Sequence, residues 1–518
     1  MCAGIVGRMS KHGEKPVGVR SLIILCMLLS LVLVLVTVRP LEVMGSLAIC
    51  RGEAGRGHLP PGGQAWTRVK VVPEWQTPAV VTDREYEMLH DEAYGVARRF
   101  VPMGTATFLF VHFSTHRVEP NSFAVVGMGA KALFLYSNPQ FFCSWHPHDY
   151  PLRSTVHANG SFIQPDRWHV SYGKQYTGTV VYCTFDLPVG SDGVGGHLVV
   201  TATHGTSHRS GLEDLSFVAK VEAPGEFNAS RFRAPYELDH VYCGAPLYGA
   251  LNPKRLREWI AYHVRFLGDR AHFFLYDAGG IEGAVLDVVR PWVAKGRVTV
   301  MNVRQGERYN SHYHNQFVVL NDCLFRSRSL AAWTWIFDVD EYLYMPPQYS
   351  SVDEVISELE SKFWGKRLQR ISMLQRPMDH KHCVRGGDSS GLDSAWALEK
   401  LVYRRTQVTE AGGQMDRKSV VRADSALAVG PHDPVRMRMP PGATEMAEVT
   451  MWESTRLQYY HYHGTVNKKE SELCNEFLGP EVNVTSFDDV QHQFDDSMKL
   501  RVEGVKRFEL ETVGSLDV

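Results

Sequence analysis

Residues 334–343 read TWIFDVDEYL, and this stretch decides the fold class. Residues 333–337 form an apolar run of the length of a buried strand, and acidic residues follow it at once. Asp338-Val339-Asp340 is the only D-x-D motif in the chain. On an extended segment, residues two apart point to the same face, so both carboxylates can reach one ion. Two solvated acids after a strand are commoner than a metal site. The neighbouring segments must therefore show which of the two this motif is.

The segments before this motif alternate between strand and helix patterns. An amphipathic helix is predicted after Asn252-Pro253, and the strand-like run AHFFLYDAGG follows at 271–280. A helix at 281–292, a strand at 297–303 and a helix at 314–329 are predicted to follow in that order. This alternation predicts an α/β domain with mainly parallel strands that are covered on both faces.

Ligands of such sheets bind beyond the carboxyl ends of the strands, where Asp277, Asp338 and Asp340 lie. Carboxylates together with phosphates and water suit Mg²⁺ or Mn²⁺, which would neutralise a departing nucleoside diphosphate. Asp277 either contacts a nucleoside or starts a turn. The pair His461-x-His463 either binds metal or is ordinary polar surface. The Gly pairs lack the spacing of a dinucleotide fold or a P-loop.

The chain before this domain is rich in strand patterns. Between residues 105 and 205, short runs of β-branched and aromatic residues are separated by Gly, Pro and Asn, which predicts a β-sandwich-like domain. Four aromatic residues of this region could stack on sugar rings or fill the core: Trp145, Trp168, Tyr172 and Tyr176.

Residues 21–38 contain no charge and are just long enough to cross a bilayer as a helix. Four basic residues precede them, which places the N-terminus in the cytoplasm and predicts a single-pass type II anchor. A cleaved signal peptide is the alternative, although no clear cleavage site follows the run. Residues 52–64, rich in Gly and Pro, read as part of a flexible stem.

Glycosylation sequons and cysteines agree with a luminal body. The sequons begin at Asn159, Asn228 and Asn483. Six cysteines follow the anchor region at 143 and beyond, and none forms a C-x-x-C pair, so they suit disulfides or buried thiols better than zinc. A formal net charge of −2 offers no basic surplus for nucleic acid.

Long blocks of the sequence resemble glycosyltransferase family 92 and, within it, the plant galactan β-1,4-galactosyltransferases. The blocks are YHNQFVVLNDCLFR, WTWIFDVDEYL, FFLYDAGG, VVRPWVAKGRVTV, EKLVYR, DRKSVV, YYHYHGTV and RFELETVG, with NSFAVVGMG in the β-rich part. The resemblance spans most of residues 95–515. Residues 430–451 match poorly, and residues 385–393 also depart from the pattern, which places acceptor contacts there in question.

The resemblance implies a GT-A fold, UDP-galactose as the donor, Mn²⁺, and inversion at the anomeric carbon. It assigns Asp338 and Asp340 to the metal and the diphosphate, and Asp277 to the nucleotide. His463, or in second place His461, becomes a further metal ligand. The β-rich part becomes a module that retains galactan. Five segments are then expected: a cytoplasmic tail at 1–20, an anchor at 21–38, a stem at 39–95, a β-rich carbohydrate-binding-like domain at 96–235 and a GT-A domain at 236–518.

The expected reaction adds galactose to β-1,4-galactan side chains of pectin in the Golgi lumen. Glu399 and Asp416 are the candidates for the base that takes the acceptor proton, and Glu341 is a candidate support of the metal site. Two alternatives stay open. One is a membrane-tethered galactan-binding protein with an inactive transferase domain, and the other is a transferase that uses UDP-arabinopyranose. A homodimer is possible.

Overall fold

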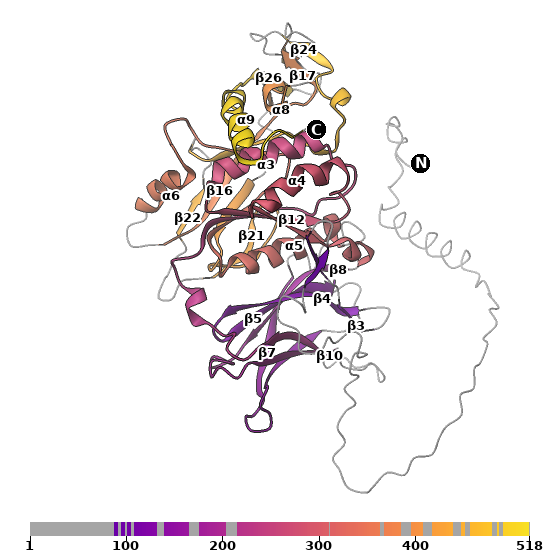
Figure 1. The fold of residues 1–518 in the computed structure, drawn as a ribbon, viewed down its shortest axis with the longest axis vertical. Helices are drawn as coiled ribbons and strands as arrows, with labels where there is room; N and C mark the ends of the chain where they lie inside the picture. The colour runs from indigo at the N-terminus through magenta and orange to yellow at the C-terminus, as the bar shows by residue number, and fades with distance from the viewer. Residues whose placement is uncertain are drawn as a thin grey trace, which may run out of the picture. The chain divides into compact units, whose positions relative to one another are not determined.

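A computed structural model describes residues 88–91, 95–98, 101–104, 108–131, 139–164, 176–203, 215–309, 311–362, 367–384, 395–407, 417–438, 447–450, 456–478, 484–485 and 490–516. All of these belong to one compact unit (Figure 1). None of the helices among them is long and apolar enough to span a membrane. The anchor predicted at 21–38 lies outside the described residues and stays a prediction.

A large mixed sheet forms the centre of the C-terminal part. Four of its strands run parallel in the order β13-β12-β11-β14, namely β13 (Val298–Asn302), β12 (Ala271–Asp277), β11 (Leu238–Cys243) and β14 (Ala331–Ile336). The chain builds β11, β12 and β13 outward in one direction and then crosses back to place β14 on the other side of β11. At such a switch point, the loops after neighbouring strands diverge and leave a crevice at their carboxyl ends.

The sheet continues past β14 with strands of both directions. Its order is β14-β19-β16-β23-β15, with β22 beside β16; these strands are β19 (Arg417–Arg422), β16 (Leu368–Pro377), β23 (Gln458–His461), β15 (Glu341–Tyr344) and β22 (Ala447–Thr450). β19 is antiparallel to β14, and β15 is antiparallel to β23. These two pairings carry the residues of the candidate site.

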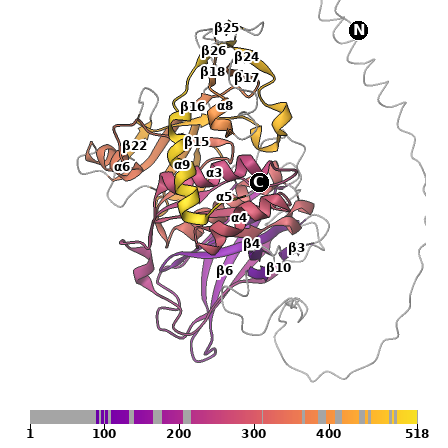
Figure 2. The ribbon, with the colours of Figure 1, turned by 45° about the horizontal axis from the view of Figure 1, so that its top comes forward.

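Helices cover both faces of this sheet, as predicted (Figure 2). α3 (Pro253–Leu267) and α4 (Ala284–Ala294) place Trp259 and Trp292 in the core on one face, to which α9 (Lys499–Val513) also contributes. α5 (His312–Ser327) packs against the other face. It was predicted to begin at residue 314, but Tyr313, His314 and Asn315 have positive φ and regular helix begins after them.

The start of α3 depends on one side chain. Oδ1 of Asn252 accepts hydrogen bonds from the backbone N–H groups of Lys254 and Arg255, at 3.0 and 3.3 Å, and Pro253 occupies the first helical position. Asn252→Ala should cost about 1 kcal/mol of stability. The thermal midpoint of the purified chain should fall, and Asn252→Ser should restore most of the loss. Equal midpoints for the alanine variant and the wild type would contradict this role.

The N-terminal part is a single antiparallel sheet of eight strands in the order β10-β9-β6-β7-β8-β5-β4-β3. The strands are β3 (Val101–Gly104), β4 (Phe108–Glu119), β5 (Ser122–Ala130), β6 (Gln140–Pro147), β7 (Val156–Ile163), β8 (Tyr176–Thr184), β9 (Gly196–Thr203) and β10 (Leu215–Glu222). The sheet folds over so that β10 approaches β4. A sandwich-like core results, but within the described strands hydrogen bonding makes one continuous sheet and not two.

The structure describes two of the four aromatic residues that could either fill the core or stack on sugar rings. Trp145 is 2% exposed and stacks on Phe123 at 5.6 Å between ring centroids, so it belongs to the core of this sheet. Tyr176 is partly buried against the core shared with α5. Trp168 and Tyr172 lie outside the described residues.

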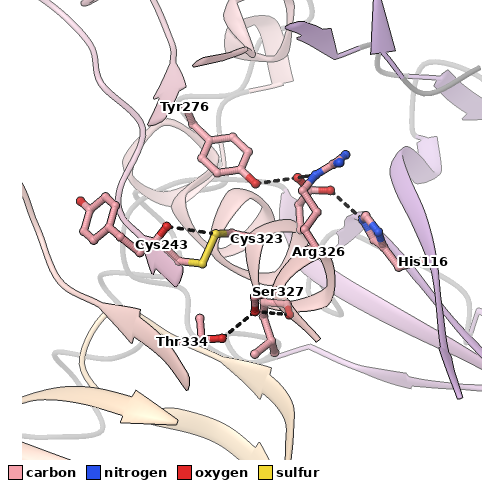
Figure 3. Close-up of a disulfide and its surroundings, with 10 residues drawn as sticks. His116, Cys243, Tyr276, Cys323, Arg326, Ser327 and Thr334 are labelled. Carbon is pink, nitrogen blue, oxygen red and sulfur yellow. Dashed lines mark hydrogen bonds and ion pairs between the residues drawn. A yellow bond between two sulfur atoms is a disulfide. The ribbon is translucent and has the colours of Figure 1, made fainter. Parts of the chain in front are cut away.

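α5 joins the β-rich sheet to the mixed sheet. Its Asp322 is fully buried and accepts hydrogen bonds from Tyr276 of β12 at 2.6 Å and from His116 of β4 at 2.9 Å. The next residue, Cys323, forms a disulfide with Cys243 at the end of β11 (Figure 3). The helix is therefore held covalently to the strand beside the switch point of the sheet.

The six cysteines predicted to suit disulfides are all paired, as Cys143–Cys183, Cys243–Cys323 and Cys383–Cys474. Of the sequon asparagines, Asn159 and Asn228 are exposed, and Asn483 lies outside the described residues.

One domain boundary differs from the prediction. β1 (Met88–Asp91) and β2 (Gly95–Arg98), which fall in the predicted stem and at the start of the β-rich domain, belong to the mixed sheet, where β2 pairs with β13. Strands of four residues carry too little alternation to be assigned from sequence.

The remaining elements are short. They are η3 (Ala229–Phe232), η4 (Arg304–Tyr309), α6 (Val352–Ser361), β17 (His382–Val384), α8 (Ala397–Lys400), β18 (Tyr403–Gln407), β20 (Ala426–Val429), β21 (Pro434–Met437), η5 (Thr465–Asn467), η6 (Glu470–Glu472), β24 (Glu476–Leu478), β25 (Val484–Thr485) and β26 (Val490–Phe494). β17 pairs with β24, and β26 lies between β18 and β25.

Candidate active site

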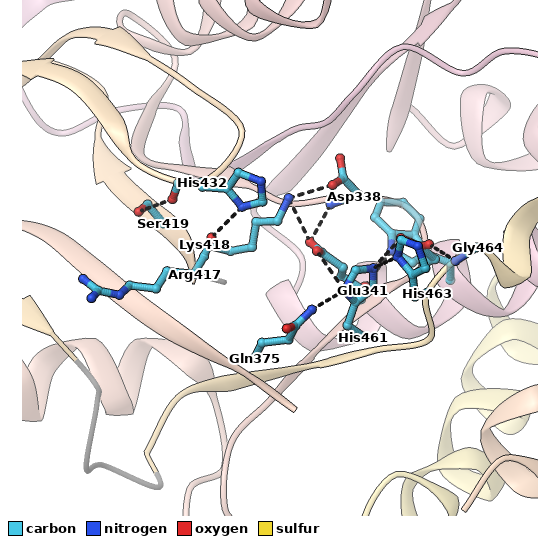
Figure 4. Close-up of polar contacts among 12 residues, drawn as sticks. Asp338, Glu341, Gln375, Arg417, Lys418, Ser419, His432, His461, His463 and Gly464 are labelled. Carbon is cyan, nitrogen blue, oxygen red and sulfur yellow. Dashed lines mark hydrogen bonds and ion pairs between the residues drawn. The ribbon is translucent and has the colours of Figure 1, made fainter. Parts of the chain in front are cut away.

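The D-x-D motif lies in the turn between β14 and β15, at the carboxyl end of the parallel strands. The motif was predicted to lie on an extended segment, but Val339 and Asp340 lie in a turn. In the antiparallel pair of β15 and β23, Glu341 lies opposite His461. The backbone N–H of Tyr462 donates to the carbonyl oxygen of Asp340 at 2.9 Å. This pairing brings the turn beside the predicted His461-x-His463 segment (Figure 4).

Asp340, His461 and His463 form a cluster that can hold a metal ion. Each offers one ligand atom, and these atoms lie within 4.8 Å of one another. Nε2 of His461 lies 3.6 Å from Oδ1 of Asp340 and 3.4 Å from Nδ1 of His463. One carboxylate and two imidazoles, with positions left for phosphate and water, fit Mn²⁺. Of the ligands predicted, Asp340 and His463 lie in this cluster, and His461, the second choice, joins them.

The cluster is shaped by hydrogen bonds around Asp340. The backbone N–H of Gly464 donates to Oδ2 at 2.7 Å, and Gly464 has φ +68°, a conformation that favours glycine. Burial raises the pKa of Asp340, but the hydrogen bonds from His461 and Gly464 outweigh it and lower the pKa. Burial lowers the pKa of His461, but Asp340 and Glu341 outweigh it and raise that pKa. The carboxylate therefore stays ionised beside its two imidazoles.

Asp338 contacts a buried cation instead of the two histidines. Nζ of Lys418 lies 2.6 Å from Oδ2 of Asp338 and 3.4 Å from Oε2 of Glu341. Lys418 and Glu341 are each 1% exposed, whereas the side chain of Asp338 is 31% exposed. Burial lowers the pKa of Lys418, but the two carboxylates outweigh it and raise the pKa. Asp338 thus keeps one side open toward solvent while Lys418 fixes the other.

Glu341 holds the D-x-D turn through a hydrogen bond to its backbone. Its Oε2 accepts a hydrogen bond from the backbone N–H of Asp338 at 2.8 Å. Burial raises the pKa of Glu341 to about 7, although the charge of Lys418 opposes this shift. The predicted role of Glu341 as a support of the site matches its position.

Asp277 lies at the end of β12 with both carboxylate oxygens engaged. Oδ1 accepts from the backbone N–H groups of Gly279 and Ile281, and Oδ2 contacts Arg304 at 2.8 Å. The side chain is fully buried. These contacts match the turn-starting alternative, and Arg304, which is 29% exposed, also pairs with the more exposed Glu282 at 2.6 Å.

Of the two candidate bases, only Glu399 lies in the described residues. Its Oε2 accepts from the backbone N–H of Trp396 at 2.6 Å and from Nζ of Lys506 at 2.7 Å, so it caps α8 and pairs with α9. The structure does not bring it to the Asp340 cluster through any contact among these residues. Asp416 lies outside the described residues, one position before β19.

Two residues of the site were not predicted. Lys418, which pairs with Asp338, and Gln375, whose Nε2 contacts Nδ1 of His461, were not among the predicted site residues. The signal that the sequence offered for Lys418 is its place in the block DRKSVV, which is one of the blocks that carry the family resemblance.

Comparison with known proteins identifies the family. A model described as glycosyltransferase family 92 matches residues 239–510, which include every described residue of the site. A protein of Arabidopsis thaliana, galactan beta-1,4-galactosyltransferase GALS1, is 35% identical over 422 residues, 81% of this chain and 79% of that protein. The chain belongs to glycosyltransferase family 92. GALS2 of the same plant is also 35% identical, over 80% of this chain and 76% of its own length.

Membership of family 92 confirms the resemblance stated from the sequence blocks, and it makes the chain an enzyme of the glycosyltransferase class. The alignments with the two relatives are longer than the family match, so the likeness extends beyond the mixed-sheet part. Asp338 and Asp340 follow β14, at the carboxyl ends of the parallel strands, where ligands of α/β sheets generally bind.

Proposed function

We propose that this chain is a GT-A-type galactosyltransferase that transfers galactose from UDP-galactose to β-1,4-galactan side chains of pectin, with inversion. The observation that carries the proposal is the Asp340–His461–His463 cluster, formed where the turn after β14 meets the end of β23, in a chain similar to two galactan galactosyltransferases. The enzyme would act in the Golgi lumen as a single-pass type II membrane protein, and it would be able to form homodimers.

The residues present fit Mn²⁺, which Asp340, His461 and His463 would hold. Bound there, the cation would neutralise charge on the departing UDP. Asp338, whose side chain is 31% exposed, would orient the diphosphate, and Arg304 would contact the nucleotide. Lys418 holds Asp338 in place through its ion pair.

The transfer is a single displacement. The 4-hydroxyl oxygen of a terminal galactose forms a bond to the anomeric carbon while the bond from that carbon to UDP breaks, and UDP leaves with the electron pair. The hydroxyl proton passes to a carboxylate base. Asp416 remains the better candidate for this base, because the carboxylate of Glu399 already caps α8 and pairs with Lys506.

The test is a donor panel with the full-length chain, Mn²⁺ and β-1,4-galacto-oligosaccharides as acceptors. We expect efficient transfer from UDP-galactose, and transfer from UDP-arabinopyranose that is about 10- to 100-fold less efficient, because a missing hydroxymethyl group removes only modest binding energy. Preference for the pentose would replace the donor assignment. Acceptor binding without turnover of any donor would instead favour a tethered galactan-binding protein.

A further inference from the structure

A second group of metal-ligating side chains lies outside the site described above. Asp379, His382 and His492 each offer one ligand atom, and these atoms lie within 4.8 Å of one another. Asp379 follows the end of β16, His382 begins β17, and His492 lies in β26, so the group joins three separate segments. Asp379 and His492 are buried. One carboxylate and two imidazoles are ligands that suit Zn²⁺, and a water molecule would complete its four-coordinate shell.

The two imidazoles converge on one carboxylate oxygen. Oδ2 of Asp379 lies 2.7 Å from Nδ1 of His382 and 2.5 Å from Nε2 of His492. The other oxygen, Oδ1, accepts a hydrogen bond from the backbone N–H of Lys381 at 2.8 Å, which fixes the carboxylate. An ion between the three groups would replace the two N–H protons that face Oδ2, and each nitrogen would then present a lone pair.

His382 has a carboxylate at each ring nitrogen. Its Nδ1 faces Asp379, and its Nε2 lies 2.9 Å from Oε2 of Glu476. Carboxylate oxygens only accept hydrogen bonds, so a neutral imidazole, with one N–H, cannot donate to both. Either an imidazolium, which donates from both nitrogens, or a divalent cation at Nδ1 satisfies both carboxylates. With the cation bound, Nε2 keeps its proton and donates to Glu476. This carboxylate–histidine–metal arrangement orients the histidine and raises its basicity.

The backbone around the cluster is tied together and borders the active site. His382 and Glu476 are register partners in the pair of β17 and β24, and the neighbouring Cys383–Cys474 disulfide joins the same two segments. On the other side, the backbone N–H of Met378 donates to the carbonyl oxygen of His461 at 2.9 Å. The residue before Asp379 is therefore hydrogen-bonded to a residue of the Asp340 cluster.

We propose that Asp379, His382 and His492 bind one Zn²⁺ in a structural site that is separate from the Asp340 cluster, with Glu476 orienting His382. The ion holds the end of β16 to β17 and β26 and so fixes the backbone beside His461. It takes no part in the transfer reaction, and the proposal does not depend on the identity of the sugar donor.

Metal content tests the proposal directly. The full-length chain is incubated with Zn²⁺, freed of loosely bound metal by buffer exchange, and its zinc is measured by mass spectrometry. Zn²⁺ can also enter the Asp340 cluster, which has the same ligand types, so zinc is counted in the Asp340→Ala background. We expect about one zinc per chain in Asp340→Ala, and little zinc when Asp379→Asn or His492→Ala is added to it. His380→Ala, one residue from Asp379 and outside the cluster, is the matched control and should keep its zinc. An Asp340→Ala chain without zinc would overturn the proposal.

One more variant keeps the test decisive if the ligand variants fold poorly. Glu476→Gln leaves all three ligands in place and changes only the partner of His382. It should weaken zinc affinity about 10- to 100-fold, measured by competition with a chelator, while the thermal midpoint in excess Zn²⁺ stays that of the wild type. Unchanged zinc affinity in this variant would show that Glu476 does not orient a metal ligand and would refute that part of the proposal.

Discussion

Asp340→Ala should lower kcat/KM for galactosyl transfer by about a thousandfold or more, because the carboxylate contributes both a metal ligand and the anchor of the turn. Asp340 is the one carboxylate in the cluster with His461 and His463. It also receives the N–H of Gly464, so its loss leaves that donor without its acceptor. Initial rates measured across a Mn²⁺ titration should show that the residual activity no longer saturates with metal in the wild-type range.

The control for this variant is Asp338→Asn. An asparagine at 338 can still accept a hydrogen bond from Lys418, and it leaves the Asp340 cluster untouched. We therefore expect Asp338→Asn to lower the rate while the Mn²⁺ concentration for half-saturation changes less than in Asp340→Ala. Both variants should be checked for wild-type thermal midpoints. Full activity of Asp340→Ala with unaltered Mn²⁺ dependence would refute the assignment of this cluster as the metal site.

The positions of the acids at the sheet edge were predictable, but their partners were not. An apolar strand followed by D-x-D places carboxylates at the carboxyl end of β14, and the structure has them there. That Asp340 meets His461, whereas Asp338 meets Lys418, depends on two pairings, β15 with β23 and β14 with β19. These join residues far apart in sequence. Periodicity tells which face a side chain takes, but not which strand lies beside it.

Asp277 shows a different limit. A carboxylate at a strand end before Ala-Gly-Gly suits a ligand contact and a turn start equally well by local chemistry. Full burial and the contacts with Gly279, Ile281 and Arg304 match the turn start. Arg304, which comes from the residues after β13, pairs there with both Asp277 and the exposed Glu282. Packing determines which partner of an ion pair faces solvent, and this cannot be predicted from the sequence.

The β-rich part illustrates the same limit at the level of architecture. Short alternating strands predict antiparallel pairing correctly, but they are compatible with two stacked sheets and with one sheet that folds over. The observed choice follows from strand order, in which β6 pairs with both β7 and β9. The side chains are buried on the same faces in either case, so the hydrophobic pattern cannot separate the two.

Lys418→Met should destabilise the fold by about 3–5 kcal/mol, because it leaves Glu341 and Asp338 without their counter-charge, one of them fully buried. Methionine fills a similar volume, so the loss reports on charge and not on a cavity. The double variant Lys418→Met/Glu341→Gln should recover much of that stability, since a neutral amide no longer needs the cation and can still accept from the N–H of Asp338. Chemical unfolding of the single and double variants measures the coupling. If the two losses simply add, Lys418 does not stabilise Glu341, and its role in the site must rest on Asp338 alone.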